Sequence, residues 1–264
     1  VELIAANKID GILELVTFEH RETPDSALAT CDVIFEGVPE VLDAKREAFS
    51  YVCERVPEST LIASTTSTIL VNELAAMVSH PQRFMNAHWL NPAHLMPLVE
   101  ISRGESSSED SIQGMVQLLE SVGKVPVVCA ATAGYIVPRL QCLAMNEATR
   151  MVEEGVASAE DIDKAVNVGF GLRFAVLGLL EFIDWGGGDI LYYASDYLSQ
   201  AIDPRYKTSD IVVENMKNGR NGVREGVGFF DYRERDVSAY RKQRMKAFIE
   251  MLRHKDLLPM HKSL

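Results

Sequence analysis

The chain has 264 residues, of which 47% are hydrophobic, so it is long enough for one large or two smaller domains with cores of their own. Its formal net charge at pH 7 is −12, and no cluster of basic residues offers a phosphate-binding surface, so we expect no nucleic-acid partner. The apolar runs fall far short of the roughly 20 residues that cross a bilayer, and we expect no membrane contact. Four cysteines stand far apart without metal-ligand spacing, which is typical of a cytoplasmic protein without disulfides or a metal site.

Strand and helix patterns alternate through residues 1–130. Residues 1–16 have the pattern of a helix already in mid-course, and residues 15–20 predict a short strand. Further strands are predicted over residues 31–38, 60–65, 83–90, 97–102 and 124–130, with helical segments over 25–30, 42–56, 68–78 and 107–123. Such alternation predicts an α/β sheet of the Rossmann type.

The second half of the chain, residues 131–264, is predicted to be helical. Its helices are expected over residues 133–156, 158–169, 179–187, 189–202, 210–219 and 238–255. Ser158 stands three residues before Asp161, which is the spacing of a helix N-cap. The sequence therefore predicts two domains, an α/β domain over residues 1–130 and an α-helical domain over residues 131–264.

The stretch NAHWLNPAHLMPLVEI, residues 86–101, places a histidine and a glutamate in strands that are otherwise apolar. If the second strand returns along the first, Glu100 comes back beside His88. A carboxylate bound to one imidazole nitrogen raises the basicity of the other, which produces a general base. Ser67 lies in a cluster of hydroxyl residues at the carboxyl end of a strand, where α/β sheets bind ligands. Each residue alone is more often structural, as a satisfied histidine or a helix cap, but their joint occurrence favours a catalytic site.

Six segments resemble, in order and spacing, the L-3-hydroxyacyl-CoA dehydrogenase family. The resemblance covers residues 31–232 and is carried by DVIFEGVPEVLDAKREAF, ASTTSTI, AHWLNPAHLMPLVEI, GKVPVVCAATAGYIVPR, EEGVASAEDIDKAVNVGFG and GVGFFDY. It implies a Rossmann-type NAD-binding domain followed by an all-α domain through which two subunits form a homodimer.

The resemblance also implies roles for individual residues. In the implied reaction the base takes the proton of a 3-hydroxyl while hydride passes from the same carbon to NAD. The family's catalytic pair falls on His88 and Glu100, and its catalytic serine falls on Ser67. Its NAD-contacting positions fall on Glu40, Lys45, Asn91 and Arg224. Ser67 and Asn91 are also expected to hold the substrate oxygen and the nicotinamide.

Two departures from the family pattern concern the cofactor loop and an asparagine. No Gly-x-Gly-x-x-Gly fingerprint occurs in the sequence, and because the chain opens in mid-helix we expect that the first β-α-β segment lies upstream. Pro138 stands where the family motif GFxxNR carries a catalytic asparagine, and proline offers neither an amide side chain nor a backbone N–H. We expect Pro138 in the first turn of the long helix, where proline is tolerated.

A third departure concerns the substrate. The stretch GFGLRFAVLG, residues 169–178, resembles relatives that act on free acids, L-gulonate 3-dehydrogenase with lambda-crystallin and carnitine 3-dehydrogenase. Arg173 would then bind a substrate carboxylate, and the alternative is a structural salt bridge with Glu181 or Asp184. A small polar 3-hydroxy acid is therefore the expected substrate. The alternatives are a 3-hydroxybutyryl-CoA or 3-hydroxyacyl-CoA dehydrogenase of fatty-acid metabolism and a non-catalytic, crystallin-like scaffold.

Overall fold

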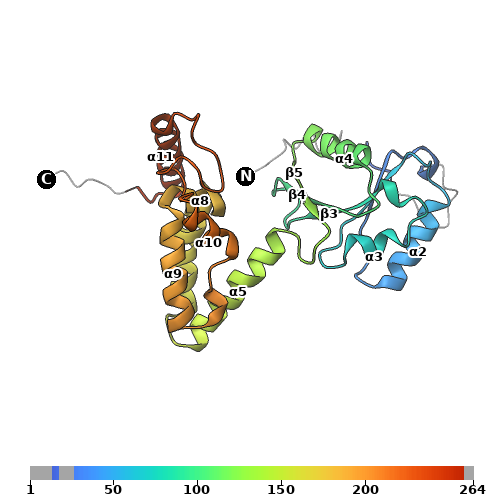
Figure 1. The fold of residues 1–264 in the computed structure, drawn as a ribbon. Helices are drawn as coiled ribbons and strands as arrows, with labels where there is room; N and C mark the ends of the chain where they lie inside the picture. The colour runs from blue at the N-terminus through green and yellow to red at the C-terminus, as the bar shows by residue number, and fades with distance from the viewer. Residues whose placement is uncertain (1–13, 18–26, 259–264) are drawn as a thin grey trace. The chain divides into compact units, whose positions relative to one another are not determined.

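The computed structural model describes residues 14–17 and 27–258, and these form two compact units that divide between residues 146 and 147 (Figure 1). The division falls within the long helix α5 (Val137–Glu153). The helix and the strand expected over residues 1–20 lie outside the described part, except for residues 14–17, which form a turn and irregular backbone.

The first unit is built on a five-stranded sheet in the order β1-β2-β3-β4-β5. The strands are β1 (Val33–Glu36), β2 (Leu61–Ser64), β3 (Phe84–Trp89), β4 (Leu98–Arg103) and β5 (Val125–Ala130). The first three strands run parallel, β4 runs antiparallel to β3, and β5 runs parallel to β4. All five lie where the sequence predicts strands, and the predicted α/β fold is confirmed.

Helices cover both faces of this sheet because side chains alternate along each strand. Ile62 and Phe84 pack on one face in a core with α2 (Leu42–Cys53) and α3 (Val71–Ala75). Their sequence neighbours Ala63 and Met85 pack on the opposite face against α4 (Glu109–Ser121). Short 3₁₀ turns, η1 (Leu28–Thr30) and η2 (Pro81–Arg83), precede β1 and β3. The helix expected over residues 68–78 is shortened to α3.

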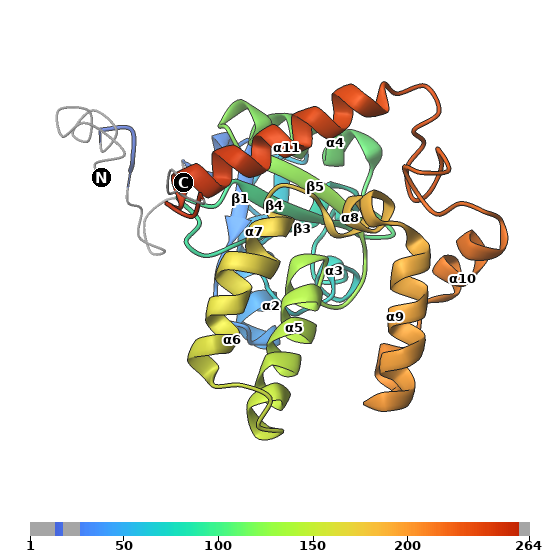
Figure 2. The same ribbon diagram turned by 90° about the vertical axis from the view of Figure 1, so that its left-hand side faces the viewer.

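The second unit is helical, as the sequence predicts. After α5 come α6 (Ala159–Ala165), the π-helical turn η3 (Val166–Phe170), α7 (Gly171–Phe174), α8 (Leu179–Gly186), α9 (Gly188–Ala201), the 3₁₀ turn η4 (Pro204–Tyr206), α10 (Asp210–Lys217) and α11 (Val237–His254). Helix α9 packs against α8 and α10 (Figures 1 and 2). The N-cap predicted at Ser158 is confirmed, because its hydroxyl accepts the N–H of Asp161.

The segment GVGFFDY, residues 226–232, is held in this unit by one buried carboxylate. Asp184 in α8 is 2% exposed and accepts the backbone N–H groups of Phe229 and Phe230 at 2.9 and 2.8 Å. Gly228 is required there because a Cβ atom at this position would overlap the Asp184 carboxylate.

In the described part of the chain, no single helix is long and apolar enough to cross a membrane. Only one bent pair of helical segments, Ala159–Phe174 and Leu179–Gly186, has the length and the apolar composition of a membrane span when the two are taken together.

Candidate active site

The predicted pair of His88 and Glu100 forms across the antiparallel strands β3 and β4. The two residues are direct partners in the strand register, and His88 Nδ1 lies 2.9 Å from Glu100 Oε2. Both side chains are buried, Glu100 completely. Because a carboxylate can only accept, Nδ1 carries the hydrogen and Nε2 keeps its lone pair. The pair therefore has the arrangement of a general base and its orienting carboxylate.

The second oxygen of Glu100 lies at the N-terminus of α5. Glu100 Oε1 accepts the backbone N–H groups of Ile136 and Val137 at 2.9 and 2.8 Å. These donors and the positive end of the helix dipole stabilise the negative charge of the buried carboxylate. Pro138 is the second residue of the helix and has no N–H to satisfy, which confirms its predicted place in the first turn.

Tyr135 also contacts this pair, and sequence analysis did not single it out. Its ring is stacked on the His88 imidazole with centroids 4.9 Å apart and planes 5° apart. Its hydroxyl donates to Thr66 O at 2.8 Å and accepts from Asn86 Nδ2 at 3.0 Å. Burial raises the pKa of Tyr135 to about 12, so the phenol stays protonated at neutral pH. The one signal in the sequence is the Gly-Tyr pair at the junction of a strand and a helix.

Ser67 and Glu40 lie together at the carboxyl edge of the parallel strands. Glu40 accepts the Ser67 N–H at 2.8 Å and the Thr66 hydroxyl at 2.8 Å. Burial alone would raise the pKa of Glu40, but these hydrogen bonds and the charge of Lys45 bring it below its usual value. The Ser67 side chain is exposed, and only its backbone N–H is used by Glu40. Glu40 thus shapes the loop that presents the Ser67 hydroxyl.

Lys45 supports the same edge from inside. Its side chain is 1% exposed, and its ammonium donates to both oxygens of Glu36 at 3.0 and 3.1 Å and to Val38 O at 3.3 Å. Glu36 also accepts the hydroxyl of Ser64 at 2.6 Å. Glu40 Oε2 lies 3.5 Å from the same ammonium. With these partners Lys45 fixes the turn after β1. Its predicted contact with NAD stays a prediction, and its partner Glu36 was not foreseen.

Asn91 and Arg224 have different surroundings. Asn91 is exposed just beyond β3, and no partner of its side-chain amide is found among residues 27–258. Arg224, in the second unit, is paired with Asp189 at 2.9 Å and Glu225 at 2.6 Å, and these carboxylates raise its pKa. Their predicted contacts with the cofactor stay predictions.

Arg173 does not form the salt bridge that sequence analysis kept as an alternative. Glu181 accepts from Arg244 Nε at 2.8 Å, and Asp184 accepts the backbone N–H groups of Phe229 and Phe230. Arg173 is exposed, and its guanidinium instead lies 4.7 Å from the centroid of the Phe182 ring. The structural alternative is therefore wrong for these two acidic residues.

The exposed polar groups at the carboxyl edge of the sheet fit NAD. The Ser67 hydroxyl and the Asn91 amide follow β2 and β3, the part of an α/β sheet where nucleotides bind. A hydroxyl and an amide are suitable partners for ribose hydroxyls and for the nicotinamide carboxamide. These residues would hold the reactive end of the cofactor.

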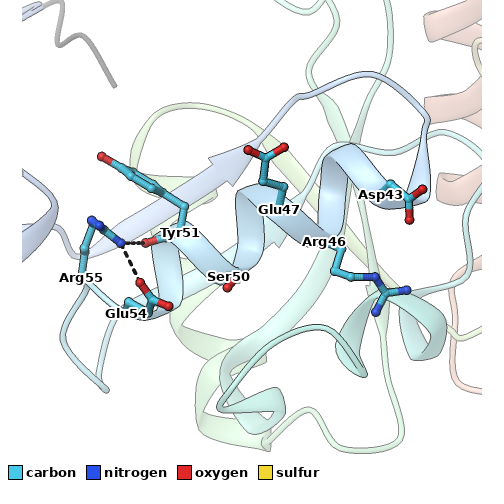
Figure 3. Close-up of a pocket in the computed structure, with 7 residues that line it drawn as sticks. All are labelled: Asp43, Arg46, Glu47, Ser50, Tyr51, Glu54 and Arg55. Atoms are coloured by element: carbon cyan, nitrogen blue, oxygen red, sulfur yellow. Dashed lines mark hydrogen bonds and ion pairs between the residues drawn. The ribbon is translucent and has the colours of Figure 1, made fainter. Parts of the chain in front are cut away.

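Other candidate sites in the described residues have no link to this pair. A shallow hollow of about 490 Å³ lies along α2. Its seven lining residues, drawn in Figure 3, all belong to α2 and the two residues after it. Arg55, at its end, is bound by Glu54 and by the carbonyl oxygen of Tyr51. Across residues 14–17 and 27–258, no group of three or more His, Cys, Asp or Glu side chains could hold a metal ion.

Comparison with known proteins gives the same family for both units. Residues 2–132 match the model of the 3-hydroxyacyl-CoA dehydrogenase NAD binding domain, and residues 134–232 match that of the C-terminal domain. A probable 3-hydroxybutyryl-CoA dehydrogenase of Bacillus subtilis is 33% identical over 77% of this chain and 70% of its own length. The 5-formyl-3-hydroxy-2-methylpyridine 4-carboxylate 5-dehydrogenase of Mesorhizobium japonicum is 29% identical over 86% of this chain and 74% of its own length.

A solved structure supports the assignment independently. The 3-hydroxyacyl-CoA dehydrogenase of Archaeoglobus fulgidus superposes with a TM-score of 0.77 and 33% identity, covering 89% of this chain and 80% of that one. Together with the buried His88–Glu100 pair and the polar edge that fits NAD, these matches show that the chain belongs to the 3-hydroxyacyl-CoA dehydrogenase family and is an NAD-dependent oxidoreductase acting on CH–OH groups.

Proposed function

We propose that the protein interconverts a small 3-hydroxy acid, with a free carboxylate, and the corresponding 3-keto acid. The observation that carries this choice of substrate is Arg173, an exposed guanidinium that no acidic side chain neutralises within the described residues. The alternative within the family is a 3-hydroxyacyl-CoA thioester, as in the B. subtilis relative's name. The crystallin-like scaffold has no support from a chain with an intact catalytic pair.

In the proposed reaction His88 Nε2 takes the proton of the substrate hydroxyl. Glu100 keeps the imidazole in the required tautomer and stabilises the imidazolium through the 2.9 Å bond to Nδ1. The Ser67 hydroxyl donates to the substrate oxygen and orients it toward the base. NAD, when bound, supplies the hydride acceptor.

Arg173 is preorganised to bind a carboxylate. The guanidinium lies 4.7 Å from the centroid of the Phe182 ring and is exposed, so its N–H donors are accessible to a planar anion. The segment before it is the π-helical turn η3, a deviation that occurs often at functional sites. The name of the M. japonicum relative includes a pyridine carboxylate, which is consistent with an acid substrate.

Pro138 is a second argument for an acid. The first turn of α5 has no backbone N–H left for a thioester carbonyl, because Ile136 and Val137 donate to Glu100, Pro138 lacks an N–H, and the Arg139 N–H donates to Gly134 O at 2.9 Å. An acid bound through its carboxylate does not need this contact.

The test compares NADH formation from 3-hydroxybutyrate, L-gulonate and L-carnitine with that from 3-hydroxybutyryl-CoA. Arg173→Met is expected to raise KM for the acid by about tenfold or more and to change KM for the thioester by less than about twofold, since a charged hydrogen bond contributes roughly 1.5–3 kcal/mol. Arg241→Met is the matched control, because the Arg241 guanidinium also lies over an aromatic ring, Trp185, at 5.6 Å. Turnover of the thioester alone, or equal effects of Arg173→Met on both substrates, refutes the proposal.

We further propose that the helical unit forms a homodimer. Ile190, Tyr193 and Tyr197 lie at helical spacing on one face of α9 and are 63%, 65% and 70% exposed. Large apolar side chains in such a row are typical of a protein interface. Sedimentation is expected to give a dimer, and Ile190→Glu a monomer. A wild-type protein that is monomeric at all concentrations refutes the proposal.

A further inference from the structure

One short turn between β5 and α5 contacts both members of the catalytic pair. The ring of Tyr135 covers the face of the His88 imidazole, and the next two residues donate their N–H groups to Glu100. The base and its carboxylate belong to the sheet, whereas all three of these contacts come from the turn and the first residue of α5. The turn is therefore placed to determine how the pair is oriented.

The backbone of Tyr135 shows that this turn is closely constrained. Its φ is +44°, in the left-handed region that residues other than glycine seldom adopt. A non-glycine residue keeps such a conformation only where its surroundings determine it. Here the constraints are the stacked ring and the hydrogen bonds of the hydroxyl, and the side chain is 4% exposed.

The hydroxyl of Tyr135 serves as an anchor. It donates to Thr66 O and accepts from Asn86 Nδ2, so its donor is used and the group is fixed between two elements. Because burial raises its pKa to about 12, the hydroxyl stays protonated at neutral pH and keeps its donor. Thr66 is also the residue directly before Ser67, so the same anchor reaches the loop that presents the serine.

The geometry of an imidazole explains what such an anchor adds. The lone pair of Nε2 lies in the plane of the ring, so a base directs it correctly only if that plane is fixed. The covalent Cβ–Cγ bond and the hydrogen bond from Nδ1 to Glu100 hold one edge of the ring, but a hydrogen bond tolerates bending, so the ring can still tilt. A parallel ring at 4.9 Å restricts this tilt.

We propose that Tyr135 is a positioning residue for the reaction: its ring fixes the plane of the His88 imidazole, and its hydroxyl ties that ring to the Thr66–Ser67 loop. Base and serine then share one anchor and keep their relative position. The inference rests on the proposed role of His88 as the base, but it does not depend on which hydroxy substrate is turned over.

The test measures kcat with the best substrate, together with the dissociation constant of NADH from fluorescence. Tyr135→Leu removes the stack and is expected to lower kcat by about 10- to 100-fold, the size of effect that a misplaced group produces, with NADH affinity changed by less than about twofold. Tyr135→Phe keeps the ring and is expected to restore kcat to about three- to fivefold below wild type. Tyr240→Phe, which removes another buried tyrosine hydroxyl, bonded to Glu181 at 2.8 Å, is the matched control and is expected to leave kcat unchanged.

The decisive measurement repeats the Tyr135 variants in a His88→Gln background. If Tyr135 acts through His88, neither variant lowers kcat further once the base is absent. The same fold loss in both backgrounds, or a folded Tyr135→Leu enzyme with kcat within about twofold of wild type, overturns the inference. If His88→Gln itself leaves kcat unchanged, the proposed base is refuted instead. If Tyr135→Leu does not fold, Tyr135→Phe is compared in the two backgrounds instead. An equal fold loss of kcat in the wild-type and His88→Gln backgrounds, or no loss of kcat in the wild-type background, overturns the inference.

Discussion

Replacing Glu100 by glutamine tests the catalytic pair most directly. The amide oxygen of the new side chain can still accept the N–H groups of Ile136 and Val137, which now lie 2.9 and 2.8 Å from Glu100 Oε1. The amide nitrogen then faces His88 Nδ1, where the carboxylate accepted a hydrogen bond at 2.9 Å. An amide N–H is a donor, so Nδ1 must become the acceptor and the ring hydrogen moves to Nε2. His88 is thus held in the tautomer that cannot take a proton.

The expected loss follows from two contributions. Restoring the active tautomer leaves two donors facing each other, at about 1–3 kcal/mol for a buried unsatisfied group. Loss of the charged acceptor for the imidazolium removes roughly another 1.5–3 kcal/mol. Together they amount to about 2.5–6 kcal/mol, or roughly a 10²- to 10⁴-fold fall in kcat.

The assay is the rate of NADH formation, with NADH affinity and thermal unfolding as controls for an intact fold. Both controls are expected to stay close to wild type, because the substitution preserves shape and the two backbone hydrogen bonds. A kcat within about tenfold of wild type would show that the 2.9 Å contact does not govern proton transfer.

Three further substitutions test the surroundings of the pair. Lys45→Met is expected to lower the free energy of unfolding by about 3–5 kcal/mol in urea titrations, because it leaves the Glu36 carboxylate buried and unpaired; a loss below about 1 kcal/mol contradicts this. The pKa of Glu40 is lowered by folding, so its stabilising contribution is present above the ordinary value of 4.5 and is lost as the pH falls through the lower folded value. The Tm of the wild type should therefore exceed that of Glu40→Gln by its largest amount at neutral pH, and this difference should shrink only below pH 4.5. A difference that grows on acidification would be inconsistent with the contacts of Glu40. Ser67→Ala should lower kcat by about tenfold or more with unchanged NADH affinity, and a change in affinity alone would assign the serine to cofactor binding.

The sequence predicts the elements that depend on regular hydrophobic spacing. All five strands and the helices α2, α4 and α9 lie close to their expected ranges, because hydrophobic residues recur along each of them at strand or helix spacing. The pairing of His88 with Glu100 was predictable for the same reason, since an antiparallel return of β4 brings the two residues together.

The parts that sequence analysis missed depend on the backbone or on distant contacts. Every residue except proline has a backbone N–H, so residue type does not reveal that Ile136 and Val137 donate to Glu100. The positive φ of Tyr135 is set by packing. The pairing of Lys45 with Glu36 joins a helix to a strand end, so a charge pattern along either element does not reveal it. The π-helical turn that interrupts the helix expected over residues 158–169 likewise has no periodic signature.

The connection between β3 and β4 has a consequence for how such an enzyme can change. His88 and Glu100 are aligned by the strand ladder, and the segment 92–97 that joins the strands is anchored separately, because Lys124 donates to the carbonyl oxygens of Ala93 and Met96 at 2.6 and 2.9 Å. Proton transfer and the shape of this segment are thus encoded by different parts of the chain. Exchanging residues 92–97 for those of a relative would change the surface beside the His88–Glu100 pair but leave the two residues in place. Substrate selectivity could then be changed, by engineering or by evolution, while the catalytic pair stays the same.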